Sequence, residues 1–180
     1  MKRLSLLILT GLFLYCATAV GQDSKPAAKD ESAKEYSTVL PNPAFEKVKS
    51  LAGQWVGGTE RAPIKMSFKV MSAGSSVLLI MDSDKPGDEM VTVFHPDGER
   101  LLATHYCSAK NQPRMRLEAG SDPNVLRFVF LDATNLADPK IGHMVGLTLR
   151  LKDSNHHLQE WTFSENGKEQ TEVFEMHRKL

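Results

Sequence analysis

The sequence predicts an all-β protein, an antiparallel up-and-down barrel of about ten strands preceded by one short helix. The first observation behind this prediction is a change in hydrophobic spacing, from near 3.6 before Gly53 to two after it. The second is a turn signal about every ten residues, as at Lys85-Pro86-Gly87-Asp88 and Pro96-Asp97-Gly98. Many strands joined by short connections favour a closed meander over a sandwich, since no long crossover connection is apparent.

Residues 1–21 have the order of a secretory signal peptide. A Lys-Arg pair is followed by an apolar stretch and then by small residues, which fit cleavage after Ala19 or after Gly21. The apolar stretch is shorter than the roughly 20 residues that a membrane-spanning helix needs. Cys16 could instead anchor a lipoprotein, but the bulky Tyr15 before it disfavours this alternative. We therefore expect a periplasmic or extracellular protein.

The overall charge excludes two classes of partner. The 180 residues hold 22 basic and 22 acidic side chains, so no basic field is available for nucleic acid. Removal of residues 1–21 leaves two more acidic than basic residues, which excludes a polybasic membrane-surface protein. If Cys16 leaves with the signal peptide, Cys107 is the single remaining thiol and no internal disulfide can form.

The next segment is a tether followed by a helix. Residues 22–42 are polar and nearly free of large apolar groups, which predicts a flexible linker. Asn42 can cap a helix whose first position is Pro43, and Gly53 would end it. Residues 43–180 are expected to form one barrel domain. The buried face of the helix would carry Phe45, Val48 and Leu51.

The remainder of the chain divides into strands at its turn signals. The irregular stretch 132–142 is expected to form a loop or one helical turn over one mouth of the barrel. A closed barrel of this size can hold a small ligand inside. The expected strands cover residues 54–60, 63–72, 75–82, 89–95, 99–107, 113–119, 124–132, 143–152, 156–164 and 168–178.

A glycine and tryptophan motif opens the first expected strand. The segment Gly53-Gln54-Trp55-Val56-Gly57 resembles the start of the lipocalin-like barrels of the calycin superfamily. The segment most resembles nitrobindin-type ten-stranded barrels and small, uncharacterised secreted bacterial proteins. The resemblance implies that Trp55 plugs the closed end. It also implies a haem-ligating histidine near the C-terminus, which His177 matches by approximate position.

His105 and Cys107 are candidates for chemistry because they lie two residues apart on one expected strand. Their side chains then face the same side of the sheet. If that side is the lumen, they could line a ligand site, ligate a metal or act as a Cys-His nucleophile. A buried cysteine packed beside a hydrogen-bonded histidine is the structural alternative.

Arg114 and Arg116 share one face of the following strand. If that face is the lumen, the two guanidinium groups could recognise an anionic ligand at the barrel mouth, with Glu160 neutralising one of them. If Met115 faces inward instead, the arginines form an ordinary solvated surface. Trp161 is expected to line the core or the lumen.

The function that follows is the binding of a small, largely apolar ligand in the lumen, with an acidic end if the arginines face inward. The residues assigned to this binding are Trp55, His105, Cys107, Arg114, Arg116, Glu160 and Trp161. The phosphate-binding, nucleophile-elbow and zinc-protease motifs are absent, so no catalytic residue or metal ligand is assigned and binding is favoured over catalysis. Haem held by His177 or His105 is one alternative. A hydrolase or isomerase that pairs His105 with Cys107 or Glu160 is another, and an envelope interaction domain is the third. The identity of the ligand and the oligomeric state cannot be read from the sequence.

Overall fold

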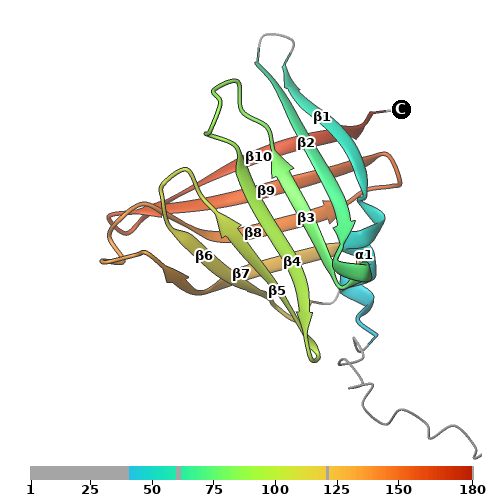
Figure 1. Cartoon of the computed structure of the whole chain (residues 1–180), viewed down its shortest axis with the longest axis horizontal. Coiled ribbons are helices and arrows are strands. Elements are labelled where there is room, and N and C mark those ends of the chain that lie inside the picture. Colours follow the sequence, from blue (N-terminus) through green and yellow to red (C-terminus); the bar gives the residue numbers. More distant parts are fainter. Residues whose placement is uncertain (1–40, 60–61, 121, 180) are drawn as a thin grey trace, which may run out of the picture. The chain divides into compact units, whose positions relative to one another are not determined.

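The computed structural model describes residues 41–59, 62–120 and 122–179. The predicted signal peptide, residues 1–21, and nearly all of the predicted linker lie outside the described residues. The described chain forms one short helix followed by ten antiparallel strands that close into a barrel (Figure 1). The predicted fold is therefore confirmed. No helix in the described ranges has the length and apolar character needed to cross a membrane.

Helix α1 (Pro43–Ser50) begins where the sequence predicts. The Asn42 side chain accepts a hydrogen bond of 3.0 Å from the backbone N–H of Phe45, and Pro43 takes the first helical position. Phe45 and Val48 are buried against the barrel. The helix therefore acts as a cover for one end of the barrel, as Figure 1 shows.

The strands follow each other in space in the order in which they occur in the chain, and β1 pairs with β10 to close the barrel. Such a meander needs only short connections, which explains the regular turn signals in the sequence. The strands are β1 (Gly53–Thr59), β2 (Ala62–Met71), β3 (Ser76–Met81), β4 (Met90–Asp97), β5 (Arg100–Tyr106), β6 (Gln112–Leu117), β7 (Val125–Thr134), β8 (His143–Leu151), β9 (His156–Glu165) and β10 (Lys168–Arg178).

Alternation along each strand sends one set of side chains into a single core. On β5, Leu101, Ala103 and His105 are almost fully buried, whereas Tyr106 is 51% exposed. The largest fully buried side chains come from helix α1 and from strands all around the barrel, and burying this much apolar surface is the main stabilising contribution. They are Trp55, Trp161, Phe45, Phe94, Phe128, Met66, Leu79, Leu101, Met115, Leu147, Leu149 and Met176.

Trp55 lies at the barrel end that α1 covers. Its indole Nε1–H donates a hydrogen bond of 2.7 Å to the carbonyl of Leu51, the residue that ends the helix. The guanidinium of Arg178, 4.3 Å from the indole centroid, donates to the carbonyls of Ser50 and Ala52. A cation at a helix C-terminus satisfies carbonyls that have no intrahelical partner. Through Arg178, the last strand therefore holds the end of the helix next to Trp55.

A loop between β7 and β8 lies at the opposite end of the barrel. Asn111 donates a hydrogen bond of 2.9 Å from Nδ2 to the carbonyl of Gly142, which fixes the end of this loop to the β5–β6 connection. A Cβ atom on Gly142 would come within 2.5 Å of the Phe163 ring, so the loop needs a glycine here. The irregular stretch expected at 132–142 is shorter than predicted, because β7 continues to Thr134.

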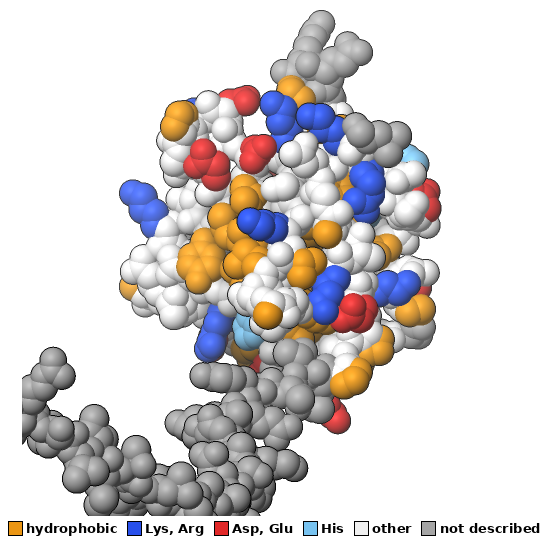
Figure 2. All heavy atoms as spheres, turned by 45° about the vertical axis from the view of Figure 1, so that its right-hand side comes forward, with side chains coloured by type: hydrophobic (Ala, Val, Ile, Leu, Met, Phe, Trp, Pro, Cys, Tyr) orange, Lys and Arg blue, Asp and Glu red, His pale blue; other side chains and the backbone are white. Residues whose placement is uncertain are grey.

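The outer face of the barrel is apolar over β3 and β4. Leu78, Ile80, Val91 and Val93 point away from the core and remain partly exposed. Hydrophobic side chains gather in the middle of the face that Figure 2 shows, with basic side chains among and around them. This surface carries none of the polar groups that the sequence analysis assigned to ligand binding.

Candidate functional site

His105 is the polar centre of the barrel interior. Its side chain is 0% exposed, and its Nδ1 lies 2.9 Å from the hydroxyl of Thr92 on β4. The hydroxyl can donate to Nδ1 or accept from it, so the contact fits either neutral tautomer of His105. Burial lowers the pKa of His105 from 6.5 to about 4, because desolvation penalises the charged ring. His105 is therefore neutral at pH 7.

A line of polar and aromatic groups continues from His105 toward the helix end. The Trp161 ring lies 4.8 Å from the His105 ring and donates from Nε1 to the Gln159 side-chain oxygen at 2.9 Å. The Gln159 amide nitrogen then lies 3.0 Å from Nε2 of His157, whose ring meets Trp55 edge-on at 4.2 Å. Both predicted tryptophans thus belong to the interior.

The histidines at both ends of this line have a ring nitrogen without a protein partner. These atoms are Nε2 of His105 and Nδ1 of His157, and both residues are 0% exposed. Burial and the charge of Arg178 lower the pKa of His157 to about 4, so its ring is neutral as well. An unpaired buried N–H costs about 1–3 kcal/mol unless a ligand or water accepts it. The interior can therefore place a small polar group, such as water, against either ring.

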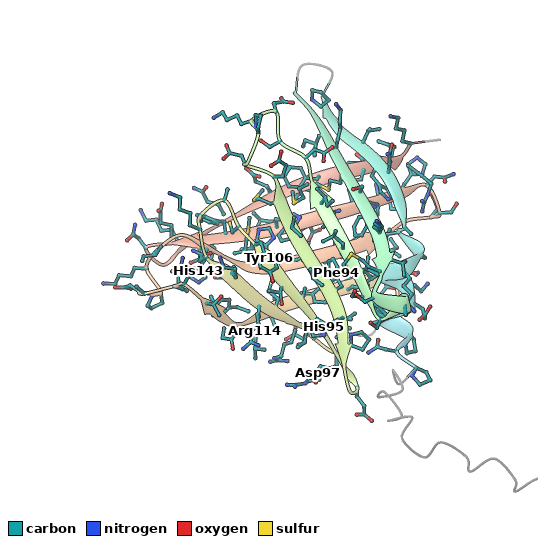
Figure 3. The ribbon with its side chains drawn as sticks, in the orientation of Figure 1. Phe94, His95, Asp97, Tyr106, Arg114 and His143 are labelled. Atoms are coloured by element: carbon teal, nitrogen blue, oxygen red, sulfur yellow. The ribbon has the colours of Figure 1, made fainter. Side chains whose placement is uncertain are left out.

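Arg114 and Arg116 lie on the outside of the barrel, so they do not form the lumenal anion site that was one of the expectations. Met115 between them is fully buried opposite Ala103. The reason is physical: burying methionine is favourable, whereas burying two guanidinium groups without partners would cost several kcal/mol. Arg114, which Figure 3 labels, instead pairs with Asp132 on β7, with 2.6 Å between Nε and Oδ1.

Neither Glu160 nor Cys107 forms a hydrogen bond with His105. The Glu160 carboxylate is on the outer face, where Arg150 donates to it at 2.6 Å. Cys107 follows the end of β5 in a tight turn, in which its carbonyl accepts from the N–H of Lys110. The ring of His105 contacts Thr92 and Trp161 instead. The acid–base pairs expected for an enzyme are thus not assembled.

His177 lies on the outer surface of β10, so the haem position suggested by the resemblance is not in the lumen. Its backbone pairs with that of His156 on β9, and the two imidazole rings lie 5.0 Å apart. The neighbouring Met176 takes the inward direction and is fully buried. Because side chains alternate along a strand, a residue matched only by approximate position can fall on the wrong face.

A cavity of about 790 Å³ lies at the helix end of the barrel, between α1 and the β6–β7 turn. Leu126 at its floor is 4% exposed and belongs to the barrel core. A volume of 300–1,000 Å³ with a mostly apolar lining is typical of small-molecule sites. Its apolar walls come from Pro41, Pro43, Ala44, Leu117, Ala119, Pro123, Val125 and Leu126. We call it the helix-end cavity.

The rim of the helix-end cavity is mainly acidic. Glu99, Glu118 and Asp122 line it together with one cation, Lys47. The amine of Lys47 donates to the Asn124 side chain at 3.0 Å, which holds it beside the turn. Glu118 is paired with Arg127, with 3.3 Å between its carboxylate and the guanidinium, so charges of both signs stand around the rim.

No signal in the sequence predicts the helix-end cavity. Its walls come from segments far apart in the chain, and the hydrogen bond of 3.3 Å from Asn42 to the Glu99 carbonyl brings the helix start to the β4–β5 turn. Local signals for both segments exist in the helix cap and in the Gly120-Ser121-Asp122-Pro123 turn. Nothing in either signal indicates that the two segments meet.

Comparison with known proteins supports the fold. No protein-family model matches the chain, and no curated protein matches it either. Among solved structures, the chain is similar to Rv2717c from M. tuberculosis, with 14% identity and a TM-score of 0.51. The match covers 77% of this chain and 98% of that one. At this identity the likeness shows a shared barrel fold, and the calycin and nitrobindin names remain a prediction.

Proposed function

We propose that this protein binds a small, largely apolar molecule in the helix-end cavity. The observation that carries the proposal is the cavity itself, about 790 Å³ with Leu117, Val125 and Leu126 on its walls. Transfer of apolar ligand surface from water onto such walls contributes roughly 25 cal/mol per Å². The alternation of the strands supplies this surface, because it places Leu117 and Leu126 on the inner side of the barrel wall.

The charge around the helix-end cavity gives no specific support for an acidic end on the ligand. The acidic end suggested by the sequence depended on Arg114 and Arg116 facing inward, and both are outside. Glu99, Glu118 and Asp122 stand at the rim instead, where Lys47 lies beside them and Arg127 pairs with Glu118. The rim therefore has no excess of positive charge that would attract a carboxylate.

The lumen proper is the alternative position for the ligand. It is favoured by Nε2 of His105, which is buried without a hydrogen-bond partner. Trp161 and Met115 fill the same interior and are 2% and 0% exposed, so a ligand there would have to displace packed side chains. Water bound to His105 would satisfy the same atom.

The interior does not fit haem. His105 is enclosed by Thr92 and Trp161, and His177 lies on the outer face. A flat macrocycle beside His105 would require the Trp161 ring, 4.8 Å away, to leave its position. We therefore derive no haem chemistry from these residues.

The cellular location is proposed from the sequence alone. The signal-like order of residues 1–21 supports export, followed by cleavage after Ala19 or Gly21. The neutral composition supports a small-molecule ligand over nucleic acid. A periplasmic or extracellular carrier of an apolar compound is consistent with both.

A fluorescence titration with the neutral apolar probe N-phenyl-1-naphthylamine tests the proposal. Gly120 lines the cavity, and a Cβ on it would meet no heavy atom within 4 Å, so Gly120→Trp should fold and fill the cavity. We expect at least a tenfold weaker affinity for this variant and little change for Gly120→Ala. If His105→Gln weakens binding and Gly120→Trp does not, the lumen is the site. If the unmodified protein does not bind the probe, the proposal fails.

A further inference from the structure

Two histidines that do not line the helix-end cavity form an exposed pair on the outer surface of the barrel. His156 opens β9 and His177 lies near the end of β10, and the two residues are direct cross-strand partners. Their ring centroids are 5.0 Å apart and their planes are nearly perpendicular. The His156 side chain is 44% exposed. Both rings are thus open to solvent and held close together by a rigid ladder of backbone hydrogen bonds.

Asp153 orients the ring of His156. Both oxygens of its carboxylate lie 2.9 Å from Nδ1 of His156. A carboxylate can only accept, so Nδ1 carries the proton and the lone pair of the neutral ring is on Nε2. Histidines that ligate metals usually donate their second ring N–H to a carboxylate or carbonyl in this way. The Asp153 carboxylate is itself held in place, because it also accepts a hydrogen bond of 2.7 Å from the backbone N–H of Asn155.

We propose that His156 and His177 form a binding site for a divalent late transition-metal ion, with Cu²⁺ bound most tightly. Neutral imidazole suits Cu²⁺, Ni²⁺ and Zn²⁺, and affinity for nitrogen sites rises to Cu²⁺ and then falls at Zn²⁺. The free lone pair of His156 is on Nε2, and His177, which is exposed, can present either nitrogen by rotating its ring. The bound ion joins the two strands.

The site uses two protein ligands. No group of three or more histidine, cysteine or carboxylate donors that could hold a metal is gathered among the described residues. Glu175, the nearest carboxylate on the outer face of β10, already accepts from Lys152 at 2.9 Å. Water or an external ligand therefore occupies the other coordination positions. A site with open positions binds reversibly and can exchange its ion or contact a further donor.

A metal that binds only the folded state also stabilises it. The metal's contribution to the free energy of unfolding rises with the logarithm of the free metal concentration above Kd. His156 and His177 belong to the last two strands, β9 and β10. Strand β10 closes the barrel by pairing with β1, and its Arg178 contacts Trp55. The unfolding temperature should therefore rise on addition of CuCl₂ and return to its starting value on addition of EDTA.

Calorimetric titration of the untagged full chain with CuCl₂ tests the proposal, with ZnCl₂ as the weaker ion. We expect one ion per chain, and at least tenfold weaker binding for His156→Ala and for His177→Ala. Asp153→Asn should weaken binding about tenfold, because it leaves the ligand in place and removes its orienting carboxylate. His95→Ala is the matched control: His95 lies on β4, away from this pair, and bonds only to the carbonyl of Pro96.

Electron paramagnetic resonance of the Cu²⁺ complex provides a readout that does not depend on affinity. The spectrum should carry the hyperfine pattern of two equivalent imidazole nitrogens, reduced to one in either alanine variant. Because both side chains are exposed, the variants should keep the unfolding temperature of the metal-free protein. The proposal is overturned if the alanine variants bind Cu²⁺ as tightly as the unmodified chain, or if no binding occurs below millimolar Cu²⁺.

Discussion

Thr92 and His105 face each other across β4 and β5 inside the barrel, with 2.9 Å between the hydroxyl and Nδ1. Thr92→Val keeps the shape of the side chain and removes this partner, which leaves both ring nitrogens of His105 unpaired. We expect a loss of about 1–3 kcal/mol in the free energy of unfolding, measured by urea denaturation.

Thr104→Val is the matched control for that change. Thr104 lies next to His105 on β5 but points outward, so its replacement should change stability by less than about 0.5 kcal/mol. Equal effects of the two substitutions would show that the buried hydrogen bond contributes nothing specific.

The two buried histidines should make the barrel sensitive to mild acid. The pKa of His105 and that of His157 are each lowered from 6.5 to about 4, so the unfolded chain binds more protons than the folded one between these values. The stabilisation that depends on the neutral rings is therefore fully present above about pH 6.5 and is lost as the pH drops toward 4. Each ring contributes a loss of up to about 3 kcal/mol over this range.

The measurement is urea denaturation at several values between pH 4.5 and pH 7. His105→Gln should flatten the dependence, and His95→Gln, on the partly exposed outer face, should not. The ion-paired carboxylate of Asp132 does not obscure the result, because its pKa is lowered below 3.8 and it is protonated only in stronger acid. A flat stability profile in the unmodified protein would mean that the histidines are hydrated or charged.

Gly57, two residues after Trp55, should not tolerate even the small side chain of alanine. A Cβ on Gly57 would lie 2.3 Å from the carbonyl oxygen of Glu175 and 2.7 Å from the sulfur of Met176. Since the first of these is backbone of the closing strand, Gly57→Ala should cost about 1–3 kcal/mol in a denaturation experiment. Gly120→Ala, which meets nothing within 4 Å, should be neutral or slightly stabilising.

Addition of haem should produce no specific complex. His177 is exposed, and Trp161 covers His105 in the interior. We expect the Soret band of micromolar haem to be the same with the unmodified protein as with a His105→Ala, His177→Ala double variant. A shifted band that disappears in the double variant would contradict the described interior.

The architecture could be predicted from the sequence because it depends on local signals. Turn residues and period-two spacing placed the strands within about two residues of their observed bounds. The cap at Asn42 and Pro43 placed the helix. These features require only neighbouring residues, and all the strands pair with the next one in the chain apart from the β1–β10 seam.

The site could be predicted only in part, because the inward face of a strand depends on the whole core. Trp55, His105 and Trp161 are inside as expected. Arg114 and Glu160 are outside, where each forms an ion pair with a neighbouring strand. The helix-end cavity requires contacts between the helix start and two distant turns, and no spacing in the sequence indicates such a contact.

Nuclear magnetic resonance with methyl-labelled protein and N-phenyl-1-naphthylamine can locate an apolar ligand at the helix end. We expect intermolecular NOEs from the probe to the methyl groups of Leu117, Val125 and Leu126. We also expect Gly120→Trp to remove them. NOEs to Leu147 and Met115 in the lumen instead, or none to the cavity walls at a saturating probe concentration, would rule out binding at the helix end.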